Sequence, residues 1–361
     1  MANLQNIRRR IRSVKSIQKI TNAMDMIARS RFNAAKDTLL SNIPYVEKTR
    51  DIIKRIMSQM SPEEESPFVM SRQELINAQA REGGKFLFLV IAADKGLAGA
   101  YSSNLFKEAH STIEYDGTTP EESSLAEKEE SFHKKNFDAV KNVKSVDGSQ
   151  LKAQHGMARA GSRRTANVNK VNVAQETHDE DYVDDIELIT IGRKATSHFK
   201  QRGYKIIKSY HGISERPTYQ YAKEIADLII ERFMSGEIID VTMVYTRFNS
   251  AISCTPDDVT LLPLVTDDYP PLKNSKEEYI YEPDVVTVLN EFLPRRIATR
   301  IYGAMLHSAA AELSSRMNAM SNATDNAQEL VGKLNLYYNK VRQAGITNEI
   351  NEIVGGANAL E

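Results

Sequence analysis

Apolar side chains recur every three or four residues near the start of the chain. The positions that share this spacing are Ile7, Ile11, Val14, Ile17, Ile20, Met24 and Ile27. Such spacing is typical of a helix with one apolar face. Glycine is absent before Gly83, and Pro44, the only proline before Pro62, is the one expected point of kinking or interruption. We therefore expect one long helix over residues 1–60.

A second apolar stripe runs through the last part of the chain. Its end has the spacing of a coiled-coil seam, at Leu330, Leu334, Tyr337, Val341 and Ala344. The stripe continues upstream at Ile297, Ile301, Met305, Ala309 and Leu313. We expect a helix over residues 284–361, bent by Pro294 near its start. Roughly 70 residues at about 1.5 Å each would span about 100 Å. Because the two helices lie at opposite ends of the chain, they can pair as a long antiparallel coiled coil.

The middle of the chain alternates between short apolar runs and amphipathic segments, and it must form a separate body. The expected strands are Lys85–Ala93, Ile186–Ile191, Tyr204–Ser209 and Ile238–Tyr245, with Ser250–Leu264 as an edge element. The expected helices are Ser102–His110, Ala195–Arg202 and Thr218–Met234. This alternation favours the α/β class, with a Rossmann-like domain and a largely parallel sheet over residues 84–270.

Residues 114–184 depart from this pattern. Apolar residues are sparse there, and acidic, basic and again acidic residues follow one another in blocks. A segment of this composition does not bury a core of its own. We interpret it as a flexible or marginally folded insertion in the α/β domain.

Composition excludes several classes of protein. The 361 residues have a formal net charge of −1, so the bulk charge predicts no nucleic-acid partner. Cys254 is the only cysteine, which excludes an internal disulfide and a cysteine-rich zinc site, and we expect it as a buried strand thiol. No run of about 18 apolar residues occurs, so no direct insertion into a membrane is expected.

The sequence lacks familiar motifs for catalysis, cofactor binding and metal binding. Asp94–Gly99 follows the first strand, where phosphate-binding loops occur, but it matches neither the P-loop nor the dinucleotide-binding pattern. A tight turn that needs glycine for its backbone shape explains it better. No serine-hydrolase or zinc-protease motif occurs, and His133, His155 and His178 are too widely spaced for a familiar metal motif. We therefore expect no catalytic residue, no cofactor and no metal.

The first helix is strongly basic. Against a single acidic residue, Asp25, its first half carries Arg8, Arg9, Arg10, Arg12, Lys15, Lys19, Arg29 and Arg31. A basic helix face can bind nucleic-acid phosphates, an acidic protein surface, or an anionic membrane. The charge pattern alone leaves these alternatives open.

More specific motifs lie in five segments of the chain. They are Ile17–Met26 (IQKITNAMDM), Asp94–Gly99 (DKGLAG), Tyr279–Pro283 (YIYEP), Ala323–Asn326 with Tyr338–Ala344 (ATDN and YNKVRQA), and Ile346–Ala357 (ITNEINEIVGGA). In this order they resemble segments of ATP synthase gamma subunits, including the terminal signature I-T-x-E-x-x-[DE]-x-x-x-G-A. The resemblance covers residues 4–113 and 186–361. It departs at residues 114–184, where typical bacterial members are far shorter, and thiol control as in chloroplast members is not implied because that insertion has no cysteine.

The resemblance implies a non-catalytic rotor shaft inside a hexamer of alpha and beta subunits, which couples ion-driven rotation of a membrane ring to ATP synthesis or hydrolysis. By matching motifs, it implies contacts with this hexamer at Arg8, Arg9, Lys19, Met24, Arg29, Arg31, Arg316, Gln343, Thr347 and Glu349. It implies contacts with the membrane ring and the epsilon subunit at Tyr279, Tyr281 and Glu282. The implied location is the cytoplasmic face of the bacterial cell membrane, as a peripheral part of the synthase, in preference to the mitochondrial inner membrane.

Two other functions make different predictions. A basic coiled-coil protein that binds nucleic acid or an anionic membrane would show steep salt dependence. An α/β nucleotide-binding enzyme with helical arms would bind nucleotide as an isolated chain. The ordered match of five motifs argues against both. For residues 114–184 we hypothesise either a regulatory or peripheral contact element or a passive loop, and unchanged ATP hydrolysis and inhibition after deletion of residues 116–183 would exclude the first.

Overall fold

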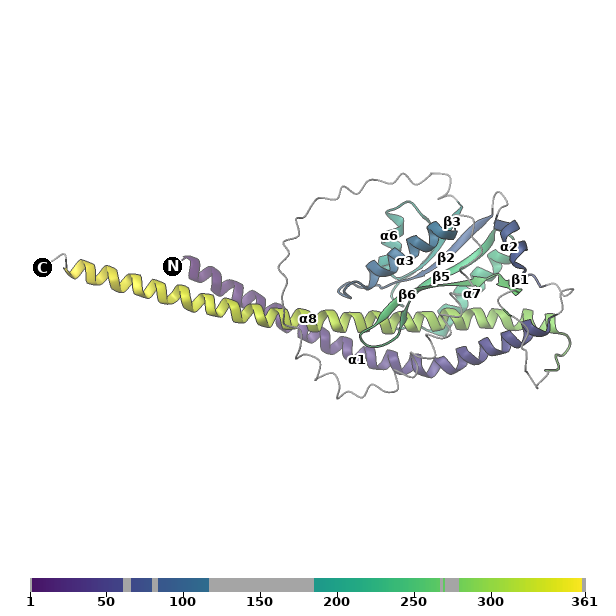
Figure 1. The fold of residues 1–361 in the computed structure, drawn as a ribbon, viewed down its shortest axis with the longest axis horizontal. Helices are drawn as coiled ribbons and strands as arrows, with labels where there is room; N and C mark the ends of the chain where they lie inside the picture. Colours follow the sequence, from purple (N-terminus) through teal and green to yellow (C-terminus); the bar gives the residue numbers. More distant parts are fainter. Residues whose placement is uncertain are drawn as a thin grey trace.

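A computed structural model describes residues 2–60, 66–79, 84–116, 185–266, 269 and 279–358. Its longest elements are α1 (Ala2–Gln59) and α8 (Val285–Asn358). These helices pack side by side in opposite directions, so both chain ends lie at the same end of the molecule, with the C-terminus further out (Figure 1). The expected antiparallel pairing of the terminal helices is confirmed. The expected insertion at residues 114–184 lies almost entirely outside the described residues.

The prolines in the two long helices do not interrupt them. α1 is continuous through Pro44, and α8 is continuous through Pro294. Pro44 lies on the exposed side of α1, where water can hydrate the carbonyl group that loses its helical hydrogen bond. The interruption that the sequence allowed at Pro44 therefore does not occur.

The residues of α8 that pack against α1 differ in part from the coiled-coil seam that we expected. At several positions the sheltered residue is the next one along the chain. Leu334 and Val341 are half-buried as expected, but Leu330, Tyr337 and Ala344 are exposed. The sheltered positions are Ala327, Val331, Leu334, Tyr338, Val341 and Gly345. The expected register was wrong because two rows of similar residues lie next to each other on this helix, and only packing against α1 decides between them.

The same correction applies to α1. Its sheltered positions alternate strictly between steps of three and four residues, at Leu4, Ile7, Ile11, Val14, Gln18, Thr21, Asp25, Ala28, Phe32, Ala35 and Leu39. Ile17, Ile20, Met24 and Ile27, which we expected on the buried stripe, are exposed. Polar or small side chains take the seam at residues 18–28, and an apolar row faces outwards beside them.

Two contacts fix the register of the pair. The Thr324 hydroxyl donates to the Thr21 hydroxyl at 2.8 Å, and an Arg8 Nη2 donates to the Tyr338 hydroxyl at 2.7 Å. The residue numbers in these pairs sum to 345 and 346, so the first residues of α1 lie opposite about residue 344 of α8. Residues 345–358 of α8 therefore extend past the start of α1, as Figure 1 shows.

Cysteines placed at positions 21 and 324 are expected to form a disulfide under mild oxidation. The two hydroxyl oxygens are already 2.8 Å apart, and a disulfide requires two side chains that approach at this range. The experiment uses a Cys254→Ser background, and mass spectrometry identifies the joined peptides. Cysteines at positions 20 and 324 are the control, because Ile20 points away from α8 into solvent; preferential joining of that pair would contradict the register.

The middle of the chain forms a five-stranded sheet in the order β4-β3-β2-β5-β6. The strands are β2 (Lys85–Ile91), β3 (Ile186–Ile191), β4 (Lys205–Tyr210), β5 (Ile238–Phe248) and β6 (Cys254–Leu262). The first four are parallel, and β6 pairs antiparallel with β5 at one edge. A separate parallel pair joins β1 (Val69–Met70) to β7 (Leu264–Val265). The mixed α/β class is therefore confirmed.

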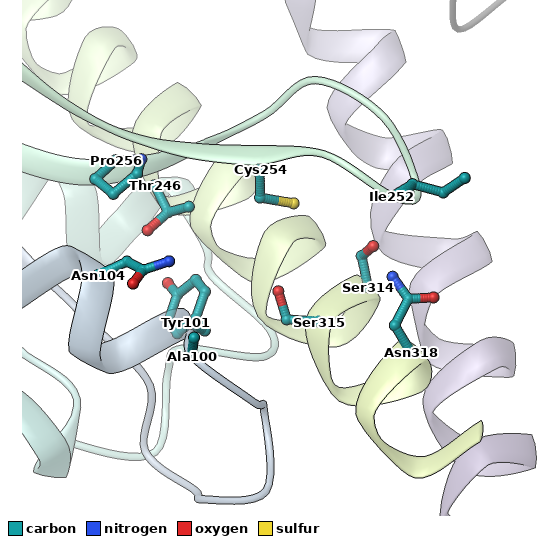
Figure 2. Close-up of a pocket in the computed structure, with 10 residues that line it drawn as sticks. All are labelled: Ala100, Tyr101, Asn104, Thr246, Ile252, Cys254, Pro256, Ser314, Ser315 and Asn318. Carbon is teal, nitrogen blue, oxygen red and sulfur yellow. The ribbon is translucent and has the colours of Figure 1, made fainter. Parts of the chain in front are cut away.

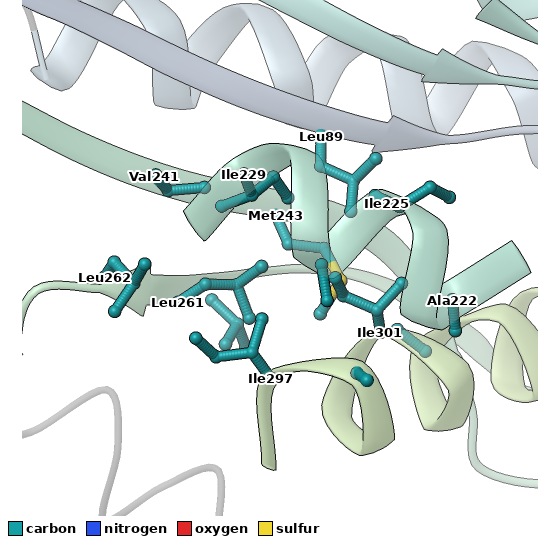
Figure 3. Packing of buried hydrophobic residues seen from close by; sticks show 14 of the residues in the cluster. Leu89, Ala222, Ile225, Ile229, Val241, Met243, Leu261, Leu262, Ile297 and Ile301 are labelled. Atoms are coloured by element: carbon teal, nitrogen blue, oxygen red, sulfur yellow. The ribbon is translucent and has the colours of Figure 1, made fainter. Parts of the chain in front are cut away.

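Helices cover both faces of the large sheet. α3 (Tyr101–Asp116) and α6 (Arg193–Lys200) pack on one face, where Leu105 and Phe199 bury against Phe88 and Leu188. α7 (Tyr219–Met234) and α8 cover the other face, and α2 (Arg72–Gln79) lies beside the sheet (Figure 1). In Figure 3 the side chains of Leu89 and Met243 from the sheet meet those of α7 and of Ile297 and Ile301 from α8. The α/β body is thus built directly on the long helix pair.

Candidate functional site

The turn Asp94–Gly99 follows β2 at the carboxyl edge of the sheet. One Asp94 carboxylate oxygen accepts the backbone N–H groups of Gly212 at 2.8 Å and Ser214 at 3.2 Å, and the other accepts that of Arg193 at 3.2 Å. Burial raises the pKa of Asp94, but these N–H donors outweigh burial and leave the pKa below its usual value. The carboxylate thus occupies backbone donors of the kind that hold phosphate in nucleotide-binding loops, and it ties together the ends of β2, β3 and β4.

Glu215 lies next to this turn and joins three separate elements. Its carboxylate accepts Lys95 Nζ at 3.1 Å and Arg316 Nη1 at 3.2 Å, and it also forms an ion pair with Arg31. Arg31 belongs to α1, Lys95 to the turn and Arg316 to α8. The cluster of these four side chains is called the Glu215 hub below. It lies where the α/β body meets the helix pair.

Arg316 is the most enclosed cation of the Glu215 hub. Its side chain is only 11% exposed, and it also contacts Glu312 at 2.5 Å and the carbonyl oxygen of Gly96 at 3.4 Å. Burial raises the pKa of Glu215, but Lys95, Arg316 and Arg31 outweigh burial and leave the pKa lowered. The sequence indicated Arg31 and Arg316 only as partner contacts and gave no signal for Glu215, which is remote from both in the chain.

Replacing Glu215 with glutamine is expected to destabilise the chain by roughly 1–3 kcal/mol, because three cations lose a shared carboxylate. The loss is measured by denaturant unfolding at pH 7. The lowered pKa means that this carboxylate stabilises the fold above its unfolded-state pKa. The difference from the wild type should therefore fade as the pH drops below about 4.5.

Glu224→Gln is the matched control for this substitution. Glu224 is half-exposed, and its ion pair with Lys208 is long, at 3.8 Å. It also accepts the Tyr210 hydroxyl at 3.2 Å, and the amide oxygen of glutamine can keep that bond. Exposed pairs of this kind contribute about 0–1 kcal/mol. Equal losses from the two substitutions would show that the Glu215 hub adds nothing beyond an ordinary surface pair.

The first half of α1 has an outward face that combines charge with apolar surface. Ile17, Ile20, Met24 and Ile27 form an exposed row there. Arg9 and Lys19 are exposed on the same part of the helix, whereas Arg29 forms an ion pair with Asp25 at 3.2 Å. Arg8 is engaged by α8, because its guanidinium lies 5.6 Å from the centre of the Tyr338 ring. Exposed apolar rows rimmed by polar residues are typical of protein contacts.

The part of α8 that extends past the start of α1, residues 345–358, is called the bare end below. It carries an apolar row that does not pack against α1. Ile346, Ile350 and Ile353 follow one another at steps of four and three residues, and all three are about half-exposed or more. Gln343 is exposed, and the Thr347 hydroxyl donates to the Gln343 carbonyl at 3.0 Å. Glu349 belongs to α8, but its side chain lies outside the described set.

The predicted foot residues lie at the opposite end of the helix pair, just before α8 begins. The rings of Tyr279 and Tyr281 are 6.4 Å apart between centroids, and the guanidinium of Arg55 lies 4.9 Å from the Tyr279 ring centre. Burial raises the pKa of Tyr281, with the neighbouring Tyr279 adding to the effect. Ile280 and Glu282 are exposed beside them. The structure therefore brings the three foot residues together and separates them from the other predicted contacts.

Within the described ranges, no group of three or more histidine, cysteine, aspartate and glutamate side chains has the arrangement of a metal site. Over the same ranges, no helix is both long enough and apolar enough to cross a bilayer. Cys254 is a free thiol at the start of β6, and it is half-buried.

Comparison with known sequences gives a consistent match. A family model described as "ATP synthase" matches residues 3–167 and 155–360. The ATP synthase gamma chain of Halothermothrix orenii is 33% identical over 366 residues, and that of Desulfitobacterium hafniense is 31% identical over 361 residues. Each alignment covers 100% of both chains.

Comparison with solved structures supports the fold. One chain from the rotor of the Euglena gracilis mitochondrial ATP synthase matches with a TM-score of 0.53 at 13% identity, covering 96% of this chain and 99% of that chain. A chain from a second structure of the same complex, in another rotational state, matches with a TM-score of 0.56 at 14% identity, covering 99% and 95%. At such low identity these matches show a similar arrangement of helices and sheet.

Proposed function

Because the chain belongs to the ATP synthase gamma chain family, and is therefore the non-catalytic central-stalk subunit of an F-type ATP synthase, we propose that α1 and α8 turn as a shaft inside a hexamer of alpha and beta subunits. The observation that best supports this is the bare end of α8. A single helix with a half-exposed isoleucine row needs a surrounding apolar surface, and a ring of partner subunits supplies one.

The residues proposed to contact the hexamer form two groups: exposed side chains, and side chains that already contact another residue of this chain. Arg9, Lys19, Met24, Gln343 and Thr347 are exposed and are proposed as direct contacts, together with Glu349. Arg8, Arg29, Arg31 and Arg316 already have partners within this chain. For these four we propose contacts in which the cation is shared with a carboxylate of the hexamer, as sliding surfaces require weak and exchangeable pairs.

Torque has a defined route from the shaft into the α/β body. The helix pair packs directly on the sheet through Ile297 and Ile301, and the Glu215 hub joins α1, the turn after β2 and α8. Because these contacts are buried or multiply paired, twist in one element is passed to the others. Coupling of ring rotation to nucleotide affinity in the hexamer then requires no chemistry in this chain.

The foot is proposed as the contact with the membrane ring and the epsilon subunit. Tyr279, Tyr281 and Glu282 lie at the end of the helix pair that is opposite the bare end of α8. The exposed Ile280 adds apolar surface there. One end of the shaft is thus available to the hexamer and the other to the ring.

The proposed location is the cytoplasmic face of the bacterial cell membrane, with the chain held there by its partners. The matched relatives named above are bacterial. We further propose a division into an N-terminal helix at residues 1–60, an α/β domain at residues 84–270 and a C-terminal helix at residues 284–361. The segment 114–184 would be an insertion in the domain, with the regulatory and passive roles both open to the deletion test.

Reconstitution tests the proposed function. The full chain is mixed with the matching alpha and beta subunits, and the size of the complex and its ATP hydrolysis are measured. A large complex whose hydrolysis depends on this chain supports the proposal. Absence of association, with the chain alone binding DNA, anionic vesicles or nucleotide, would overturn it.

Replacing both Ile346 and Ile350 with aspartate is expected to weaken assembly with the hexamer by tenfold or more. Burial of one isoleucine contributes about 1.5–3 kcal/mol, and about 1.4 kcal/mol corresponds to tenfold in affinity. Ile252→Asp is the control, because Ile252 is 77% exposed on the hairpin between β5 and β6, away from the bare end. Thermal unfolding of the isolated chain should be unchanged in both variants. Unaltered assembly of the double variant would contradict the proposed contact.

A further inference from the structure

A small cavity lies at the carboxyl edge of the sheet, between the first turn of α3, the β5–β6 hairpin and one turn of α8 (Figure 2). Its volume is about 130 Å³, whereas one water molecule takes roughly 30 Å³ in the liquid. β2 and β5 are the neighbouring strands at which the order of the sheet reverses. In open α/β sheets, this is the position at which ligands bind.

One hydroxyl in the wall of this cavity makes no hydrogen bond of regular geometry. Thr246 is only 3% exposed, and within the described part of the chain its Oγ1 has only a weak contact with the Tyr101 hydroxyl. Figure 2 shows this oxygen directed towards Asn104 and Tyr101 across the cavity. Leaving a buried polar group without a good partner is unfavourable, so a bound molecule that pairs with this hydroxyl is stabilised by it.

The remaining walls are held in place by the protein itself. Ser314 and Asn318 on α8 both donate to the carbonyl oxygen of Ala251 in the hairpin, at 2.6 and 2.7 Å. The Tyr101 hydroxyl donates to the Ser308 carbonyl at 3.4 Å. These bonds join the hairpin and α3 to α8 around the cavity, so its shape is set before any molecule enters.

The lining limits the chemistry of a bound molecule. It consists of hydroxyl, amide, thiol and apolar groups, with no lysine, arginine, histidine, aspartate or glutamate among the lining residues. A charged molecule would therefore lose its hydration without gaining an opposite charge. A neutral molecule with hydroxyl or carboxamide groups can pair with Thr246 and with the exposed amide of Asn104 at the mouth.

We propose that this cavity is a binding site for a small neutral polyol or carboxamide, with the Thr246 hydroxyl as its anchor. The bound molecule bridges α3, β5 and α8 and braces the α/β body against the helix pair. The site is separate from the Glu215 hub and from the proposed surfaces for partner subunits. Glycerol is a suitable probe for the polyol class.

Cys254 reports on occupancy, because it lines the cavity and is the only cysteine in the chain. Burial raises the pKa of its thiol to about 11, so alkylation by iodoacetamide is followed at pH 9, where thiolate forms measurably. Glycerol at ten times its dissociation constant should slow alkylation about tenfold. Sucrose, which is too large for the cavity, controls for general effects of polyols on the protein and should leave the rate unchanged.

Substitutions at Thr246 test whether its hydroxyl group binds the molecule in the cavity. Thr246→Val removes the hydroxyl with little change of shape, so it should fold normally and lose protection by glycerol. Thr246→Ser retains the hydroxyl and should keep the protection. Protection that is absent in the wild type, equal for sucrose, or undiminished in Thr246→Val would overturn the proposal and leave a cavity that holds water only.

Discussion

Replacing Gly192 with alanine is expected to destabilise the chain by roughly 2–5 kcal/mol. Gly192 lies between β3 and α6 with φ +94°, where an L side chain is strained. A Cβ there would clash with the carbonyl oxygen of Ala92 and lie 2.8 and 2.9 Å from the carbonyl carbons of Ala92 and Ala93. These atoms are backbone, and Ala92 is held by its own N–H bond to Ile191 at 2.8 Å. Neither the backbone of residue 192 nor that of Ala92 and Ala93 can move away without disrupting the edge of the sheet.

Gly203→Ala is the matched control. Gly203 also has a positive φ, of +84°, but no atom lies within 4 Å of the position where its Cβ would be. Gly203→Ala should therefore destabilise the chain only through the strain of an L residue at positive φ, by about 1–2 kcal/mol. Thermal unfolding of both variants separates the two contributions. Similar losses would mean that the close approach of β2 and β3 at Gly192 contributes nothing.

Much of the fold was predictable because the signals are local. The steps of three and four residues between Ile297 and Leu313 indicate a helix whatever lies against it. Runs such as Ile186–Ile191 and Ile238–Tyr245 are too short and too apolar for a surface helix. The alternation of such runs with helices was sufficient to predict the α/β class, and the observed strands β3 and β5 begin where the sequence predicted.

The register of the helix pair was less predictable. A periodic pattern indicates that a face exists, but it does not choose between two adjacent rows that are both acceptable. In α1, the row that faces α8 contains Gln18, Thr21 and Asp25, whereas the apolar row at Ile17 and Ile20 faces solvent. Such an inversion is informative, because exposed apolar residues beside a polar seam indicate a second contact surface.

The contacts of the candidate site were partly predictable. The glycines of Asp94–Gly99 indicated a tight turn, and Leu97 and Gly99 do have positive φ. The role of the Asp94 carboxylate was missed, because its donors at Arg193, Gly212 and Ser214 follow other strands. Glu215 was missed for the same reason, since an ion-pair hub depends on which loops meet at the edge of a parallel sheet. No local motif carries that information.

Replacing Asp240 with asparagine is expected to stabilise the chain at pH 8 and to have little effect at pH 4. Asp240 is buried in β5, and within the described residues its carboxylate has no ion pair, only a hydrogen bond from Thr242 at 3.1 Å. Burial raises its pKa to about 7. Between about pH 4 and pH 7 the folded chain therefore holds a proton that the unfolded chain has released.

Between about pH 4 and pH 7 the folded state binds more protons than the unfolded state. The free energy of unfolding of the wild type therefore falls as the pH rises through this range. Asparagine keeps the shape and an oxygen that accepts from Thr242, but it cannot ionise. Its gain should therefore set in at about pH 4, grow as the pH rises and level off above about pH 7 in a series of denaturant unfolding curves. The exposed Asp227 of α7 is the control, and Asp227→Asn should show no such pH dependence. An equal effect of Asp240→Asn at pH 4 and pH 8 would mean that ionisation of this buried carboxyl group does not affect the stability of the fold.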